Sequence, residues 1–369
     1  PVRRRAGRFG KLSGGAPMRS VFHRPGDAPW RRRIVFAALA VAAARAEPPP
    51  PTPEFDLRLR QVRLDREGAG AISETRLRLE ARLEAPISDA VTAVVALATC
   101  RQGAPVAAEA TLGEDPGDLP LAVRTASLAW RPETVPGLTL LAGKMEAPWA
   151  RASDLVWDDD VRPEGGAVRW SRARGALDAL ALAGAFILRD DDFGGEREYL
   201  YAVQMAARHR WPDRSFALAG AGFYPSDTPA SDSGRPSARA LRCRPLEIFA
   251  AGTWELYFPV RGVIHYVVNP EAERARAGGL AGLTIGRTDA IHGLELGWQW
   301  RRIESDAVQP AFTDDTLWPG TGRTEHRWRV AYRPAARLLL SLVWSEGRRL
   351  DGAAPDGLRA VSLEARAEF

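Results

Sequence analysis

Residues 75–85 read TRLRLEARLEA, and apolar and charged side chains alternate along nearly the whole stretch. Leu77, Leu79, Ala81 and Leu83 would share one face of an extended chain, and the residues between them would place their charges on the other face. A period of two is the signature of a β-strand with one apolar and one polar face. The stretch therefore predicts a strand, because the apolar positions of a helix recur every three to four residues.

The same alternation returns along the chain, and sustained helical periodicity is almost absent. Seven short connections and eight long ones separate the alternating segments, as in an up-and-down meander with an even number of strands. The long connections fall near 65–74, 101–120, 147–163, 189–196, 225–245, 269–276, 304–322 and 347–356. Sixteen strands are predicted, over 55–64, 75–85, 90–100, 121–131, 137–146, 164–173, 177–188, 197–211, 214–224, 246–257, 259–268, 277–287, 289–303, 323–333, 335–346 and 357–369.

The N-terminal segment differs from the rest of the 369-residue chain in charge. Residues 1–46 hold eleven basic residues and one acidic residue, whereas the remainder holds 40 basic and 45 acidic residues. The basic balance of the whole chain therefore does not indicate a nucleic-acid partner. Arg31–Arg33, a ten-residue apolar run and a small-x-small site ending at Ala46 are typical of a secretory signal peptide.

The predicted organisation follows from that signal. Residues 1–46 are read as leader and signal peptide, with Met18 as the expected start and cleavage after Ala46; an uncleaved N-terminal anchor is the alternative. A Pro-rich spacer covers 47–53, and residues 54–369 form the β domain. Export leads to an oxidising compartment, but two cysteines, Cys100 and Cys243, make no disulfide framework. Two unpaired thiols are expected, and a single Cys100–Cys243 bond is the alternative.

The amphipathic strands raise the question of which solvent meets the apolar face. No apolar run after the signal is long enough for a membrane-spanning helix. Charged residues are dense on the polar face of strand after strand, which fits a barrel with lipid outside and water inside. Aromatic residues also lie near predicted strand ends, where an outer-membrane barrel has its aromatic girdles: Trp170, Trp211, Tyr224, Trp254, Tyr266 and Trp344.

We therefore predict an all-β fold: a transmembrane, antiparallel, up-and-down barrel of about sixteen strands, with short periplasmic turns and longer extracellular loops. The last strand alternates up to Phe369, the final residue of the sequence. A terminal aromatic residue on such a strand resembles the signal by which the barrel assembly machinery recognises bacterial outer-membrane proteins. A soluble periplasmic β-protein is the alternative that extraction from membranes would eliminate.

Several stretches resemble the putative porin family of Gram-negative bacteria, whose architecture is similar to that of the general trimeric porins. They include DLRLRQVRLD (56–65), ASLAWRPETVPGLTLLAGKMEAPW (126–149), DLVWDDDVRPEGGAVRW (154–170), GAGFYP (220–225) and RTDAIHGLELGWQWRRIESDAVQPAFTDDT (287–316). The resemblance implies an integral outer-membrane channel for passive diffusion of small hydrophilic solutes or ions. It also implies contact with outer-membrane lipid and lipopolysaccharide, and a homotrimer.

In general porins the loop after the fifth strand folds into the lumen and narrows it, which makes the third long loop the candidate constriction. By position, its acidic side would be Asp154, Asp158, Asp159 and Asp160. A basic wall would line the pore on the first, second and fourteenth predicted strands: Arg58, Arg60, Arg76, Arg78, Arg82, Arg327 and Arg329. Opposed acids and bases would set up a transverse field. The alternative is a solvated acidic loop with ordinary lumen charges.

Other functions are kept open but have less support. The acidic runs at 158–160 and 190–192 are possible calcium ligands, although three adjacent acids need a bent backbone to reach one ion. The histidines show no metal-ligand spacing, so we expect neither a metal nor another cofactor. A barrel enzyme would need a nucleophile near the lipid rim, and no serine there has a nearby histidine, so no catalysis is expected. An adhesin or structural anchor would differ from a porin by not conducting.

Overall fold

The computed structural model describes residues 50–68, 70–100, 109–113, 119–189, 198–226, 243–314, 316–318, 320–350 and 357–369. The predicted leader and signal, the first three residues of the spacer and the acidic run at 190–192 lie outside these residues. Within the described part, no helix is long and apolar enough to cross a membrane.

The described residues form seventeen strands and one short 3-10 helix, η1 (Pro310–Phe312). Every strand pair is antiparallel. The strands are β1 (Thr52–Arg66), β2 (Gly70–Ser88), β3 (Val91–Thr99), β4 (Ala110–Thr111), β5 (Leu121–Trp130), β6 (Leu138–Lys144), β7 (Glu164–Arg174), β8 (Leu177–Arg189), β9 (Glu198–Arg210), β10 (Phe216–Phe223), β11 (Leu246–Glu255), β12 (Pro259–Val268), β13 (Ala277–Gly286), β14 (Leu294–Ile303), β15 (Arg323–Ala335), β16 (Leu338–Arg349) and β17 (Gly357–Glu368).

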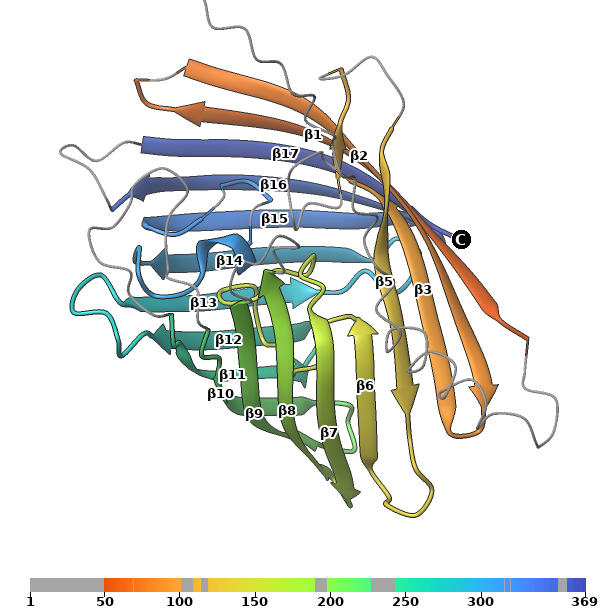
Figure 1. Ribbon diagram of the computed structural model, residues 1–369. Coiled ribbons are helices and arrows are strands. Elements are labelled where there is room, and N and C mark those ends of the chain that lie inside the picture. The colour runs from red at the N-terminus through yellow and green to blue at the C-terminus, as the bar shows by residue number, and fades with distance from the viewer. Residues whose placement is uncertain are drawn as a thin grey trace, which may run out of the picture. The chain divides into compact units, whose positions relative to one another are not determined.

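The sheet closes on itself because β1 pairs with both β2 and β17. Leu57 lies opposite Leu79 on one side and Ala367 on the other. Among the described strands, β1–β3 and β5–β17 make a closed ring of sixteen, and the two-residue β4 pairs with β2 beside that ring. Figure 1 shows β1 beside β17, with β14–β16 following in order. The predicted antiparallel barrel and its strand number are confirmed.

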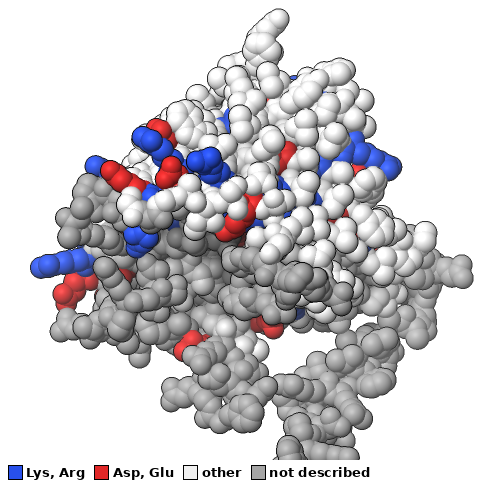
Figure 2. Space-filling model, turned by 90° about the horizontal axis from the view of Figure 1, so that it is seen from above, with Lys and Arg blue, Asp and Glu red and all other residues white. Residues whose placement is uncertain are grey.

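Alternation along the strands separates two faces of the barrel wall. Leu57, Leu59 and Leu79 are exposed on the outer face, whereas Arg60 and Arg78 on the same strands are buried on the inner face. The outer face meets lipid in such a barrel, so exposed leucines are favourable there. On the face seen in Figure 2, uncharged residues form a broad area and charged side chains lie mostly toward its margins.

Five of the six aromatic residues assigned to the girdles are exposed: Trp170, Trp211, Trp254, Tyr266 and Trp344. The assignment of Tyr224 is wrong, because its side chain is only 1% exposed. Tyr224 follows β10 on the inner face, and its ring lies over Gly222, where a Cβ atom would come within 2.5 Å of the Tyr224 hydroxyl oxygen. Glycine at 222 thus makes room for an aromatic ring inside the barrel.

The first predicted long loop, 65–74, is absent. β1 continues to Arg66 and β2 begins at Gly70, so a tight turn joins the two strands. Gly68 and Gly70 have φ angles of 80° and 84°, which glycine adopts without steric cost. In the opposite sense, the predicted strand 289–303 begins only at Leu294, since residues 287–293 form a longer turn. Cys100 and Cys243 are both free thiols, as expected.

Part of the barrel interior is filled by packed apolar side chains. A cluster of buried apolar side chains joins the connection between β6 and β7 to inner-face residues of β7, β8, β9, β12, β13 and β14. Figure 1 shows this connection, drawn in yellow to green, turning toward the strands rather than away from them. The loop therefore rests on one side of the lumen, and the charged inner faces of β1, β2 and β15 belong to another side.

The separation of faces predicts an asymmetric response to a new charge on β16. Leu342→Arg places a guanidinium on the lipid face and should lower the free energy of unfolding by about 2–4 kcal/mol. Leu339→Arg on the same strand is the matched control, because Leu339 lines an internal cavity; it should cost clearly less. Denaturant unfolding in lipid vesicles, followed by tryptophan fluorescence, measures both. Equal losses would contradict the assignment of the two faces.

Candidate functional site

The third loop, residues 145–163 between β6 and β7, is held against the barrel wall by aromatic packing. The ring centroids of Trp149 and Trp157 are 4.4 Å apart. Trp157 also packs edge-on against Tyr224 at 4.9 Å, and Trp149 against Phe186 of β8 at 5.7 Å. Burying each such side chain contributes about 1.5–3 kcal/mol, so the apolar face of the loop supplies a strong anchor.

Polar contacts reinforce the same anchor. The Gln204 side chain on β9 accepts a hydrogen bond from the Ala150 backbone nitrogen at 2.7 Å and donates one to the Ala150 carbonyl at 2.8 Å. Its amide nitrogen also contacts Glu247 of β11 at 3.1 Å. The Tyr224 hydroxyl donates to Glu247 at 2.6 Å. The backbone of Ala150 is therefore hydrogen-bonded by a side chain of the wall, as buried polar groups require.

A serine and a histidine do meet inside the barrel, which the sequence analysis did not foresee. Ser153 Oγ of the third loop lies 2.7 Å from His265 Nδ1 on β12, and His265 Nε2 lies 3.0 Å from Glu247 Oε2. The serine belongs to a loop in the lumen and not to a strand at the lipid rim. Both ring nitrogens are occupied, so the trio joins the loop to β11 and β12. No pattern in the sequence predicts a contact between two residues that are 112 positions apart.

Asp160 is bonded to basic residues on two neighbouring parts of the wall. Its Oδ1 lies 2.8 Å from Arg78 of β2 and 2.5 Å from Arg124 of β5. Glu80 holds the same two arginines, at 2.5 Å and 3.1 Å. Burial alone would raise the pKa of Asp160, but Arg78 and Arg124 outweigh burial and hold that pKa below its ordinary value. Asp160 therefore stays ionised and pins the end of the loop.

Asp154 joins a second cluster of ion pairs, on β14 and β15. It contacts the buried Arg301 and lies 3.7 Å from Arg327. Arg327 also lies 2.7 Å from Asp314, a buried residue of the connection between β14 and β15. Burial would raise the pKa of Asp314, but Arg327 and Arg301 hold it well below the ordinary value. Two loops thus share one pair of arginines.

The other two predicted acids point elsewhere. Asp158 is buried, and its Oδ1 accepts a hydrogen bond from the Asp160 backbone nitrogen at 2.9 Å. The Asp159 side chain is 87% exposed and pairs with Arg151 at 2.9 Å. The three adjacent acids therefore face different partners rather than one cation. Within the described ranges, no group of three or more His, Cys, Asp or Glu side chains could hold a metal ion.

The seven predicted wall arginines alternate onto the inner face of β1, β2 and β15, but they are not bare. Arg60 contacts Glu109 at 3.0 Å and Glu364 of β17 at 2.6 Å. Arg58 and Arg76 each lie 3.9 Å from Glu109. The others have carboxylate partners as well: Arg78 with Glu80 and Asp160, Arg82 with Glu54 and Glu84, Arg327 with Asp314 and Glu325, and Arg329 with Glu295. The inner face of these strands therefore carries arginines and carboxylates that contact one another, rather than positive charge alone.

The seventh loop, residues 304–322, is a part of the site that the sequence analysis missed. The Asp158 backbone nitrogen of the third loop donates to the Phe312 carbonyl at 2.7 Å, and the Phe312 ring stacks on Trp157 at 5.3 Å. Farther along, Leu317 is buried against β1 and β17. The two loops therefore meet inside the barrel. Arg124, Arg301 and Glu325 were also missed, although their alternation on β5, β14 and β15 marks the inner face.

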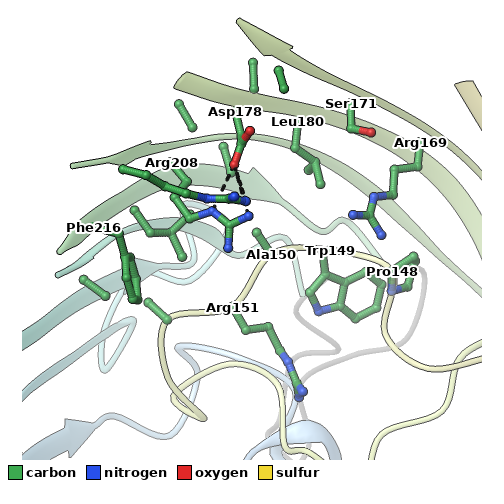
Figure 3. Close-up of a pocket in the computed structure, with 18 of the residues that line it drawn as sticks. Pro148, Trp149, Ala150, Arg151, Arg169, Ser171, Asp178, Leu180, Arg208 and Phe216 are labelled. Carbon is green, nitrogen blue, oxygen red and sulfur yellow. Dashed lines mark hydrogen bonds and ion pairs between the residues drawn. The ribbon is translucent and has the colours of Figure 1, made fainter. Parts of the chain in front are cut away.

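Two of the cavities that described residues line lie inside the barrel and share one side chain, Arg261 of β12. The larger holds about 800 Å³ between the third loop and the inner faces of β7–β12. Figure 3 shows Arg169, Asp178 and Arg208 on the strand side of this space, with Pro148 and Trp149 of the loop facing them. The smaller holds about 360 Å³ beside Arg58, Arg60 and Arg327.

A closed antiparallel barrel with an apolar outer face and a charged lumen defines the class of outer-membrane β-barrel channels. A family model described as Putative porin matches residues 67–237 of the chain. This match and the closed sixteen-stranded ring together identify the chain as an outer-membrane porin. Among proteins with curated descriptions, none matches the sequence.

Solved structures share the fold at low sequence identity. The chain is similar to OprB of Pseudomonas putida, with a TM-score of 0.62 and 10% identity over 86% of this chain and 94% of that one. It is also similar to the outer-membrane protein OmpT of Vibrio cholerae, with a TM-score of 0.51 and 12% identity over 86% and 99% of the two chains. The outer-membrane channel DcaP of Acinetobacter baumannii gives a TM-score of 0.51 and 12% identity over 86% and 97%.

The contacts of Asp160 predict that the third loop becomes mobile when the charge of Asp160 is removed. Asp160→Asn should weaken the bonds to Arg78 and Arg124, destabilise the seated loop by about 2 kcal/mol and increase the open-channel current noise. Asp159→Asn is the matched control, since its side chain is exposed; it should change stability by less than about 0.5 kcal/mol. Equal noise in the two variants would contradict the role of Asp160 as a pin.

The lowered pKa values of Asp160 and Asp314 predict how the loops respond to acid. A displaced loop would return both carboxyls to the ordinary value near 3.9. The pinning is therefore complete above that value and is lost as the pH falls through the lowered pKa values. Current noise should stay constant from neutral pH down to about pH 4 and rise only in stronger acid. A rise in current noise that begins between neutral pH and pH 5 would contradict the lowered pKa values of these two carboxyls.

Proposed function

We propose that the protein conducts small hydrophilic solutes and ions by passive diffusion, through the part of the lumen that the third and seventh loops leave open. The cavity of about 360 Å³ beside Arg58, Arg60 and Arg327 supports this path. The apolar anchor of the third loop lies on the opposite side, against β7–β14. In this proposal the two loops form the constriction, with Asp154, Asp158, Asp159 and Asp160 on the third loop.

We further propose that the channel prefers anions. The smaller cavity is lined by six arginines and two glutamates, so its lining has a formal surplus of four positive charges. The larger cavity is lined by six arginines and one aspartate. Among the acids of the third loop, Asp160 pairs with Arg78 and Arg124, which line neither cavity, whereas Asp154 pairs with Arg327 and offsets one of these charges. Charges at the narrowest point decide ion preference in a pore.

Assembly enters the proposal through two further features. A homotrimer in the outer-membrane lipid and lipopolysaccharide is proposed because OmpT of Vibrio cholerae is known in a trimer form. Phe369 is proposed as the signal for the barrel assembly machinery. Its backbone nitrogen donates to the Phe55 carbonyl at 2.9 Å, and its ring remains 61% exposed. The Phe369 ring would therefore be accessible to the assembly machinery, although hydrogen bonds already join β1 to β17 at this point.

Conductance in a planar bilayer distinguishes a channel from the two alternatives, an adhesin or structural anchor and a barrel enzyme. The refolded protein should give discrete conductance steps, and a salt gradient should give a reversal potential of the sign expected for anion preference. Heat-modifiable gel mobility confirms that the sample is a folded barrel. A folded barrel without conductance would overturn the transport role, and a cation-selective reversal potential would overturn the preference alone.

A further inference from the structure

The larger cavity combines an apolar floor with a surplus of positive charge. It lies toward the end of the barrel that carries the short turns, since its lining comes from the ends of β7, β9 and β12 next to those turns. Leu180, Phe216, Leu218 and Val263 supply apolar surface on the wall, and Trp149 supplies it on the third loop. An ordinary water-filled pore needs no such apolar surface.

Four arginines on the inner faces of three strands line the same space: Arg169 of β7, Arg208 and Arg210 of β9, and Arg261 of β12. Among the described lining residues there is one carboxylate, Asp178, which pairs with Arg208 at 3.1 Å and with Arg210 at 2.6 Å. Arg169 and Arg261 form no ion pair within the described part of the chain. Figure 3 shows Arg169 pointing toward Trp149, into the space between strand and loop.

This arrangement suits one class of ligand. A guanidinium group binds a carboxylate or phosphate through paired N–H donors, and its planar fork favours such groups over a spherical ion. A cavity of about 800 Å³ falls in the range of small-molecule sites, which have mostly apolar walls and a few polar groups that fix orientation. Chloride or inorganic phosphate would use the arginines but would leave Leu180, Phe216 and Trp149 without a partner.

We propose that this cavity is a binding site for a small organic anion with an apolar body, such as an aromatic carboxylate. The carboxylate meets one of the two arginines without an ion pair in the described part of the chain, Arg169 or Arg261, and the apolar body lies against Phe216 and Leu180. The site rests on the proposed function, because the anion reaches it through the channel. The site shares the third loop and Arg261 with the conduction path. The arginines of the constriction lie instead on β1, β2, β5, β14 and β15 and already hold carboxylates of the chain.

Block of single-channel current by benzoate tests the proposal, with benzamide as the neutral probe of the same shape. Benzoate added to the wild-type protein should reduce the current in a concentration-dependent way, more strongly from one side than from the other. Benzamide and acetate should each need at least tenfold more, because benzamide lacks the charge and acetate lacks the ring. Isothermal titration calorimetry of the folded protein in detergent measures benzoate binding without any current.

Two variants separate a site from general charge attraction. R169Q/R261Q should raise the half-blocking benzoate concentration at least tenfold, and F216A should raise it for benzoate but not for acetate. R174Q is the matched control, because Arg174 lies on β7 with Arg169 but does not line the cavity; it should bind benzoate as the wild type does. The single variants R169Q and R261Q replace the double variant if its gel mobility shows that it does not fold.

The outcomes for the channel and for the site are distinguishable. A folded barrel that gives no current but still binds benzoate by calorimetry would overturn the proposed function and keep the site. A conducting barrel that shows neither block nor binding heat would overturn the site and keep the function. An equal loss of benzoate block in R174Q and R169Q/R261Q would reduce the effect to overall charge and would also overturn the site.

Discussion

The pairing of β1 with β17 is the interaction on which the rest of the structure depends. Hydrocarbon offers no hydrogen bonds, so a sheet can cross a membrane only when its last strand returns to its first. This closure is visible where Leu57 lies opposite Ala367. The backbones of Phe55 and Phe369 also hydrogen-bond to each other in both directions. Once the ring is closed, alternation must send every second side chain into the enclosed space, and the lumen takes its chemistry from those residues.

The lumen is divided into two environments. On the side of β7–β14, apolar inner residues receive the apolar face of the third loop and exclude water. On the side of β1, β2, β5, β15 and β17, arginines and carboxylates alternate in contact with one another. The third loop belongs to both environments, because its tryptophans need the first and Asp160 needs the second. That double attachment fixes the loop more firmly than either contact alone could.

The strands could be predicted from the sequence because alternation is local. Arg58, Arg60, Arg76 and Arg78 fall on the inner face by parity alone, and the structure places them there. The dry side of the lumen was missed, although residues 179–188 are apolar or glycine on both faces, a pattern typical of a strand buried on both sides. Tyr224 was misplaced because position near a strand end does not say toward which face a ring points.

The charge pairing lay beyond local reasoning. The distance from Asp160 to Arg124 or from Asp154 to Arg301 depends on how the loop is seated, and nothing in the spacing of those residues records it. The seventh loop was missed for the same reason, since Asp314 and Leu317 show no periodicity. Ser153, His265 and Glu247 come from the third loop, β12 and β11, and only the closed barrel brings them together.

The double attachment of the third loop also sets an order of events during folding. Its tryptophans need Phe186 of β8 and Tyr224, which follows β10, and Asp154 needs β14 and β15. All of these partners come later in the chain. Contacts so distant in sequence cannot form until most of the strands are paired. We therefore expect the barrel wall to form first and the third loop to pack against it afterwards. In the proposed function, a newly closed barrel is a wide channel, and its constriction forms only with this final step.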